Sequence, residues 1–298
     1  MTDRAGAGGA GADGGLVRWS VDRLGDLVAL VDAGLPDEGL GADDLLATTF
    51  EDDGVVLGPA DGSGAVAVVR RPTGTGVVAA VQVVVVDPDA RRRGLGRHLL
   101  DEASRWAAAD GASHLVLGGA APWYLWPGVD ATATPALCLA EASGFAPRGC
   151  EVNLSLPTTL RVDPPSGVTV ARALEEATAS SAQALIAEHW PQWSAEVGRA
   201  VEQGTCLVAM ADDRAVGVAC HSVNRPGWLG PMATDPARQR AGVGAGLVSA
   251  VCEDLMVAGH ERAEIAWVGP VRFYAKLGAT VSRVFRTYAK ALEQARPV

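Results

Sequence analysis

The strongest constraint on the fold is a pattern that occurs twice, at an interval of 148 residues. The stretch "DPDARRRGLGRHLL" begins at Asp87, and "DPARQRAGVGAGLV" begins at Asp235. Each copy has Asp-Pro, a glycine seven positions after the aspartate, a second glycine two positions later, and then apolar residues at helical spacing. Self-similarity of this kind predicts two copies of one structural unit in tandem.

The similarity continues on the C-terminal side of both stretches. Each copy has a strand-like run ("HLVLGG", "AEIAWV"), a short helix closed by glycine ("ALCLAEASGF", "VRFYAKLGA") and a terminal strand. The first copy carries an insertion of 14 residues within "APWYLWPGVDATATP", and "LPTTLRVDPPSG" between the copies is rich in proline. We therefore expect a disordered tail over residues 1–15, a first domain over 16–156, a linker over 157–167 and a second domain over 168–298.

Hydrophobic periodicity predicts the same succession of elements in each unit. In the first unit it predicts a strand at "LVRWSV", helices near Arg23–Ala33 and Ala42–Phe50, and strands near Val55, Ala65–Arg70 and Val77–Val86. In the second unit it predicts a strand at "GVTVARA", helices near Ala177–Glu188 and Ser194–Glu202, and strands at "TCLVAMA", "AVGVACHSV" and "GWLGPMA". The fold class is α/β, with a mixed, mostly antiparallel sheet flanked by helices in each unit.

Composition excludes several classes of function. A net charge of -10 argues against a nucleic-acid-binding protein, which needs an excess of Lys and Arg. The five cysteines are far apart without a CxxC pair, so we expect reduced thiols in the core, with no disulfide framework and no metal site. The first 15 residues lack the apolar segment of a secretory signal, and the longest apolar run, Val77–Val86, is too short to cross a bilayer. We expect a cytoplasmic protein that binds no membrane.

The glycine turn between a strand and a helix is typical of an anion site. Backbone N–H groups at a helix start are unpaired and lie at the positive end of the helix dipole. Gly94 and Gly96 leave room for a phosphate, and Arg91, Arg92 and Arg93 add positive charge. A plain helix start with solvated arginines explains one copy equally well, but two copies at equal spacing favour phosphate recognition. Neither copy has the lysine of a Walker loop or the third glycine of the dinucleotide fingerprint.

The remaining pattern, R/Q-x-x-G-x-G/A, resembles the signature of the GNAT acetyltransferase superfamily, and the resemblance extends over nearly the whole chain as a tandem. It implies that acetyl-CoA is the co-substrate, with its pantetheine along the fourth strand of a unit and its pyrophosphate on the amides of the glycine turn. The cofactor-binding residues that it implies are Val84, Val85, Val86, Arg91, Arg92, Arg93, Gly94, Leu95, Gly96 and Arg97 in the first unit, and Met232, Ala233, Thr234, Gln239, Arg240, Ala241, Gly242, Val243, Gly244 and Ala245 in the second.

The same resemblance implies a tyrosine on the last short helix as the general acid. The matching residues are Tyr274 in the second unit and Ala140 in the first, so only the second unit has the acid. The second unit also has Pro231 in the strand that should supply N–H donors, either as a bulge that opens the acetyl pocket or as a damaged site. Glu188 and His189 are candidates for the base that takes the proton from the amine.

Two functions from different classes follow. The first is an acetyl-CoA-dependent N-acetyltransferase that acts on a primary amine of a small molecule or peptide. The second is a non-catalytic acyl-CoA-binding regulatory or scaffold protein. Tyr274 favours the first, whereas Pro231 and Ala140 favour the second. The aromatic insertion "PWYLWPGVD" is either a lid or a patch that covers the other unit.

Overall fold

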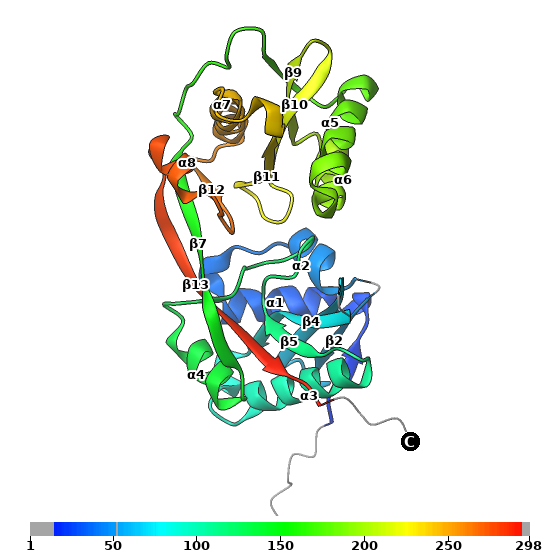
Figure 1. The fold of residues 1–298 in the computed structure, drawn as a ribbon. Coiled ribbons are helices and arrows are strands. Elements are labelled where there is room, and N and C mark those ends of the chain that lie inside the picture. The colour runs from blue at the N-terminus through cyan, green and yellow to red at the C-terminus, as the bar shows by residue number, and fades with distance from the viewer. Residues whose placement is uncertain (1–14, 52, 75, 294–298) are drawn as a thin grey trace, which may run out of the picture.

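The computed structural model describes residues 15–51, 53–74 and 76–293. In these residues the chain forms two lobes that share a single sheet (Figure 1). The expected tail over residues 1–15 lies almost wholly outside the described residues. The mixed α/β architecture predicted from the repeat is confirmed.

The first lobe contains the elements expected for the first unit. Its strands are β1 (Val17–Trp19), β2 (Gly54–Gly58), β3 (Gly64–Thr73), β4 (Gly76–Val86), β5 (His114–Leu117) and the short β6 (Val129–Asp130). Its helices are α1 (Leu24–Gly34), α2 (Ala42–Thr49), α3 (Leu95–Ala109) and α4 (Thr134–Ala142), and a 3-10 turn, η2, covers Pro36–Glu38. The long strand β7 (Ala146–Pro157) follows α4.

The second lobe repeats this succession. Its strands are β8 (Thr169–Arg172), β9 (Cys206–Ala211), β10 (Arg214–His221), β11 (Trp228–Thr234) and β12 (Arg262–Ile265). Its helices are α5 (Glu176–His189), α6 (Ser194–Gln203), α7 (Val243–Val257) and α8 (Val271–Lys276), with a 3-10 turn, η4, over Pro191–Trp193. The chain ends in the long strand β13 (Thr280–Ala291).

Helices cover both faces of the sheet because alternate strand residues point to opposite sides. In β3, Val66 and Val68 pack with α3 residues, whereas Ala65 and Ala67 pack with residues of α1 and α2. This alternation explains why β3 is buried over most of its length, and why its sequence is almost continuously apolar.

The last strands of the two halves are exchanged between the lobes. The sheet order is β1-β2-β3-β4-β5-β13-β7-β12-β11-β10-β9-β8. The C-terminal strand β13 pairs with β5 of the first lobe, β7 pairs with β12 of the second lobe, and the two strands pair with each other along most of their length. Figure 1 shows them as the two-stranded ribbon that joins the lobes. The sequence did not predict this crossover.

The exchanged strands also contribute side chains to the core of the lobe in which they pair. Tyr288 of β13 is buried in the core of the first lobe with Leu99 and Leu115. Leu154 and Leu156 of β7 are buried in the core of the second lobe. Each lobe is therefore completed by a strand from the other half of the sequence.

The segment between β7 and β8 runs along α7. The Thr158 hydroxyl donates to the carbonyl of His260 at 2.8 Å, and the Val162 amide donates to the Ser249 hydroxyl at 2.9 Å. This segment corresponds to the linker expected over residues 157–167, and it is packed against the second lobe. Within the described residues, no helix is long and apolar enough to span a membrane.

The expectation that all five cysteines lie in the core is wrong for two of them. Cys206, Cys220 and Cys252 are buried, but Cys138 and Cys150 are exposed, and all five are free thiols. Cys138 is on α4 and Cys150 is in the part of β7 whose residues are exposed, so neither position faces a core.

Candidate functional site

The sheet opens into a wedge at the same place in each lobe. In the first lobe, β4 and β5 pair in parallel only as far as Val81 and Leu117. In the second lobe, β11 and β12 pair only as far as Leu229 and Ile265. Beyond these residues the pairing ends, so Val84–Val86 and Met232–Thr234 pair with β3 and β10 on one edge only, and their other edge faces the wedge. An extended ligand with amide groups can pair with such an edge.

The glycine turns after β4 and β11 have the same backbone conformation. Gly94 and Gly242 have φ values of 90° and 91°, and Arg92 and Arg240 have φ values of 64° and 63°. A side chain at either glycine would be strained at this φ whatever the space around it. The side chains of the preceding Asp87 and Asp235 each accept a backbone N–H two residues later, at 2.8 Å.

These turns fit the pyrophosphate of a CoA molecule. The first N–H groups of α3 and α7 have no partner within the helix, and an added Cβ at Gly94 would meet no atom within 4 Å. Arg91 contributes differently from what the sequence indicated: its guanidinium donates to the carbonyls of Val86 at 3.0 Å and Gly34 at 2.8 Å. It thereby holds the end of α1 against β4, while Arg92 and Arg93 are exposed beside the turn.

A cavity of about 460 Å³ lies at the wedge of the second lobe. Residues of β11, β12, η4, α6 and α8 and of three loops line it: Ala121, Tyr124, Trp193, Glu196, Asn224, Trp228, Leu229, Gly230, Pro231, Met232, Ile265, Ala266, Trp267, Val268, Gly269, Pro270 and Tyr274. Most of these side chains are apolar or aromatic.

Tyr274, the predicted general acid, lines this cavity from α8. The helix follows Pro270, and Tyr274 is 5% exposed with its hydroxyl 3.9 Å from the Met232 sulfur. Burial raises the pKa of the Tyr274 phenol, so the phenol keeps its proton at neutral pH. A buried phenol with little competing hydrogen bonding is suited to donating a proton to a leaving group in the cavity.

A carboxylate that the sequence analysis did not single out lines the same cavity. Glu196, in the first turn of α6, is 5% exposed and accepts a hydrogen bond from the Asn224 amide at 3.2 Å. Burial raises the pKa of Glu196 to about 7, although the Asn224 hydrogen bond and the charge of Arg199 oppose the shift. A carboxyl group with this pKa can accept a proton at neutral pH. The available signal was an acidic residue beside Val197 and Ala200 on the buried face of a helix.

Pro231 lies in an irregular part of β11. The register between β10 and β11 shifts between the pairs Ala219–Met232 and His221–Leu229, so Gly230 and Pro231 form a bulge. Both residues line the cavity. Of the two interpretations given for this proline, the bulge that borders the pocket agrees with the geometry.

The aromatic insertion of the first lobe reaches the second lobe. Tyr124 is 8% exposed, and its ring centroid lies 5.3 Å from that of Trp267 and 6.0 Å from that of Trp228. The guanidinium of Arg199 lies 3.2 Å from the centroid of the Trp123 ring. The insertion is thus a patch that covers the other lobe, and Tyr124 forms part of that lobe's cavity wall.

The matching wedge of the first lobe has only a small cavity, of about 140 Å³. Ala140 lines it at the position that corresponds to Tyr274. Gln82 also lines it, and the Gln82 carbonyl oxygen is buried with no hydrogen-bond partner among the described residues. A ligand N–H group, such as a pantetheine amide, would satisfy that oxygen.

An ion-pair network around Glu38 borders the same small cavity. Glu38 of η2 accepts hydrogen bonds from the Trp126 indole at 2.8 Å and from Arg283 of β13 at 2.7 Å, and Arg225 of the second lobe pairs with it at 2.9 Å. Burial by itself would raise the pKa of Glu38, but these hydrogen bonds and the charge of Arg283 outweigh it and lower the pKa to about 2. Arg283 also pairs with Asp130 at 2.8 Å. The carboxylate therefore stays ionised and joins the lobes.

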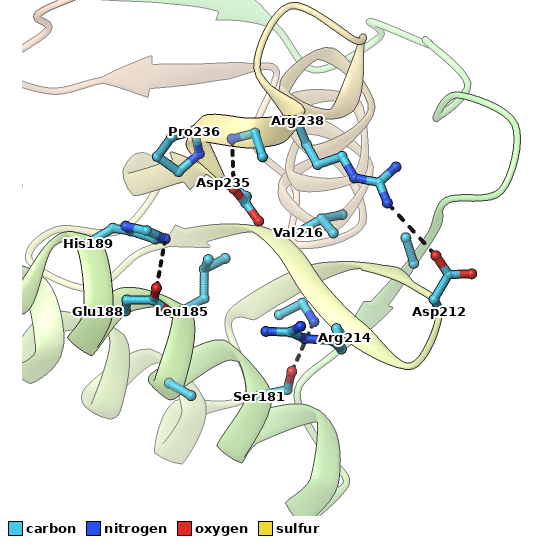
Figure 2. A pocket seen from close by; sticks show the side chains of 14 residues that line it. Ser181, Leu185, Glu188, His189, Asp212, Arg214, Val216, Asp235, Pro236 and Arg238 are labelled. Carbon is cyan, nitrogen blue, oxygen red and sulfur yellow. Dashed lines mark hydrogen bonds and ion pairs between the residues drawn. The ribbon is translucent and has the colours of Figure 1, made fainter.

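Glu188 and His189, the base candidates from the sequence, line a different cavity. This groove of about 660 Å³ lies between the end of α5, the β9–β10 turn and the Asp235–Arg238 segment (Figure 2). The two side chains approach to 3.7 Å and are exposed. Tyr274 does not line this groove. In the described part of the chain, no group of His, Cys, Asp and Glu residues is arranged to hold a metal ion.

Comparisons with known proteins agree with this architecture. The model of the Acetyltransferase (GNAT) family matches residues 32–123 and 171–279. Among solved structures, a tandem GNAT protein from the clavulanic acid biosynthesis pathway is 16% identical with a TM-score of 0.71, covering 94% of this chain and 99% of its own. A GCN5-related N-acetyltransferase from Sphaerobacter thermophilus is 16% identical with a TM-score of 0.62, covering 95% and 97%.

A third similar structure is the glucosamine N-acetyltransferase region of a fungal multi-domain β-N-acetylglucosaminidase. It is 18% identical with a TM-score of 0.73, and the match covers 92% of this chain but only 38% of the fungal chain. At these identities the solved structures establish the fold alone. No protein of curated function matches the sequence.

Proposed function

Because the chain belongs to the acetyltransferase (GNAT) family, and is thus an acyltransferase, we propose that it transfers an acetyl group from acetyl-CoA to a primary amine of a small molecule or peptide, and that the reaction takes place in the second lobe. The observation that carries this proposal is that Glu196 and Tyr274 line one cavity at the wedge beside β11. Acetyl-CoA supplies the activated acyl group as a thioester. All other chemistry falls to side chains of this protein.

Glu196 and Tyr274 have complementary tasks. An amine attacks a thioester only as the free base, so its ammonium form must first lose a proton. We assign that proton to the Glu196 carboxylate, whose pKa of about 7 matches the task. The amine nitrogen then bonds to the acyl carbon, the carbon–sulfur bond breaks, and the Tyr274 phenol gives its proton to the departing thiolate. The nitrogen loses its second proton as the amide forms, and that proton restores the Tyr274 phenol from the phenolate.

Cofactor binding in the second lobe is assigned to the edge of β11 and the turn at the start of α7. We propose that Met232, Ala233 and Thr234 pair with the pantetheine, and that the amides from Arg240 to Ala245 bind the pyrophosphate. The likeness of this turn to that of the first lobe, with Gly94 and Gly242 in the same conformation, supports the assignment.

The first lobe has the features of a cofactor site without transfer. It has the same glycine turn, from Arg91 to Arg97, beside the strand segment from Val84 to Val86, and Gln82 offers an unpaired acceptor. Ala140 gives no acid, and the ion pair of Glu38 with Arg283 lines the cavity where the second lobe has Glu196 and Tyr274. We therefore propose that this lobe binds CoA and does not turn it over. The alternative of a wholly non-catalytic acyl-CoA-binding protein would extend this description to both lobes.

The test is thiol release from acetyl-CoA, measured with and without a panel of primary amines. Amine-dependent release, with the acetylated amine found by mass spectrometry, is the expected result. CoA binding by calorimetry without amine-dependent release would contradict transfer and favour the alternative.

A further inference from the structure

The polar groups deep in the second-lobe cavity are hydrogen-bond acceptors. Glu196 presents a carboxylate, and Asn224, 7% exposed, uses its amide N–H to reach that carboxylate. This leaves the Asn224 carbonyl oxygen buried with no hydrogen-bond partner among the described residues. A buried acceptor without a partner costs free energy, so it indicates a ligand that donates N–H groups. A primary ammonium group has three such donors and the matching charge.

Aromatic rings surround this acceptor pair. Tyr124, Trp193, Trp228 and Trp267 all line the cavity. Tyr124 is edge-on to Trp267, with an interplanar angle of 79°, and tilted by 46° against Trp228. Rings at these angles form a corner into which another flat ring can pack edge-to-face or offset. Their negative faces also attract a cation.

The rest of the cavity wall offers little to a polar acceptor. Leu229, Met232, Ile265 and Val268 are apolar, and the further side-chain polar groups are the phenols and indoles. The hydroxyls of an amino sugar, or the second ammonium of a polyamine, would find few hydrogen-bond partners there in place of the water that they lose, which costs affinity. An aromatic ring gives up no hydrogen bonds to water when it enters the cavity.

We propose that the acceptor is a primary arylalkylamine, that is, an ammonium group joined by a short chain to an aromatic ring, with the ammonium bound by Glu196 and Asn224 and the ring packed against Tyr124, Trp228 and Trp267. The inference rests on the proposed function and names its substrate class. Tyr124 makes the first lobe a determinant of specificity for the second, because it is the aromatic wall supplied by the other half of the chain.

The experiment compares kcat/KM for four amines with the full chain. These are 2-phenylethylamine, its saturated counterpart 2-cyclohexylethylamine, glucosamine and putrescine. We expect 2-phenylethylamine to lead, with a KM about 3- to 10-fold below that of the cyclohexyl compound, as ring–ring packing predicts. Glucosamine and putrescine should be at least about 10-fold poorer in kcat/KM because their polar groups remain unpaired.

Variants of neighbouring aromatic residues provide the matched control. Tyr124→Leu should remove the preference for the aryl over the cyclohexyl amine, whereas Tyr124→Phe, which keeps the ring, should retain it. Trp123→Leu, next in the chain but outside the cavity lining, should also retain it. The preference is a ratio measured on one variant at a time, so a general loss of folded protein does not change it.

The outcomes separate the two levels of the proposal. Turnover that is fastest with glucosamine or putrescine, or an aryl preference unchanged in Tyr124→Leu, overturns the arylalkylamine assignment and leaves the acetyltransferase function standing. No turnover with any amine, together with retained CoA binding, overturns both.

Discussion

Glu196 shows how the surroundings of one residue determine its chemistry. Glu202 lies on the same helix, α6, and is exposed, whereas Glu196 is turned toward the core. Desolvation disfavours the charged form, which is why its pKa rises toward neutrality. The burial of this one side chain therefore makes Glu196 able to accept a proton near neutral pH.

The first prediction concerns the pH dependence of turnover. If the ionised Glu196 carboxylate takes the proton from the amine, kcat/KM should rise with pH and level off above about 7. Glu196→Gln should lower kcat roughly 100-fold and remove this acidic limb. Steady-state assays from pH 5.5 to 9 measure both effects. An unchanged limb in Glu196→Gln would assign it to another group.

The same pKa shift predicts a pH-dependent stability. The folded-state pKa of about 7 lies above the ordinary glutamate pKa of 4.5, so the unfolded state loses its proton first as the pH rises. As the pH rises between these values, the free energy of unfolding of the wild type should fall by up to roughly 3 kcal/mol relative to that of Glu196→Gln, since one pKa unit is about 1.4 kcal/mol. Urea unfolding at pH 5 and pH 8 tests this. If the free energies of unfolding of the wild type and of Glu196→Gln change with pH in the same way, Glu196 is solvated in the folded protein.

Tyr274 provides the second test of the catalytic pair. Tyr274→Phe keeps the ring that packs beside Phe273, at a centroid distance of 4.8 Å, but deletes the proton. The fold should survive, kcat should fall roughly 100-fold or more, and CoA affinity should change little. Thiol release and calorimetry on the same preparation separate these effects. Equal turnover in Tyr274→Phe would make Tyr274 a packing residue.

At the scale of elements, the two lobes share the strand, glycine turn and helix of the proposed CoA site, and they differ in the residues that lie beside these elements. The turns at Gly94 and Gly242 are alike in backbone conformation. Beside them, the first wedge holds a salt-bridged network, and the second holds a cavity lined by Glu196 and Tyr274. The duplication is thus compatible with the proposal that the first lobe binds CoA and the second lobe transfers the acetyl group.

Matched changes in the two turns test this division. A glutamate at Gly94 or Gly242 puts negative charge where the pyrophosphate is proposed to bind, so each variant should lose CoA binding in one lobe. We expect Gly242→Glu to abolish turnover and Gly94→Glu to leave turnover while lowering the CoA stoichiometry in calorimetry. The controls are Gly94→Asn and Gly242→Asn, which share the backbone strain without the charge. Loss of turnover in Gly94→Glu alone would place the reaction in the first lobe.

At the scale of the whole molecule, the exchanged strands make the lobes interdependent. Removing a strand from a shared sheet exposes an edge and a core in both lobes. The Glu38 network adds polar contacts between η2, β13 and the second lobe. We therefore expect the two lobes to unfold together, in a single calorimetric transition.

Because the strands are exchanged, a mutation in β13 should destabilise the first lobe, and a mutation in β7 should destabilise the second. Tyr288→Ala, near the C-terminus, should destabilise the first lobe by about 3–5 kcal/mol, as expected for removing a large buried ring. Amide exchange should show the largest loss of protection in β4 and β5. Leu154→Ala, in the last strand of the first unit, is the reciprocal control and should act first on β12 and α7. Tyr288→Ala effects confined to the second lobe would contradict the exchange.

Features that depend on local periodicity and turn chemistry could be predicted from the sequence. The doubled Asp-Pro and glycine pattern predicted two like units, and the strands and helices lie where alternation and helical spacing put them. The same is true of the positions of Tyr274 and Ala140 on matching helices, since these follow from counting residues within a repeat. The acetyltransferase family also followed from these local patterns.

The contacts between distant parts of the chain could not be predicted in this way. The pairing of β13 with β5, the meeting of Glu196 with Tyr274, and the position of Tyr124 in the wall of the other lobe all join residues that are distant in the chain. A strand's periodicity states which face is apolar but not which lobe supplies its partner, because either edge offers the same backbone hydrogen bonds. The desolvation that raises the pKa of Glu196 likewise exists only once several elements have closed around it.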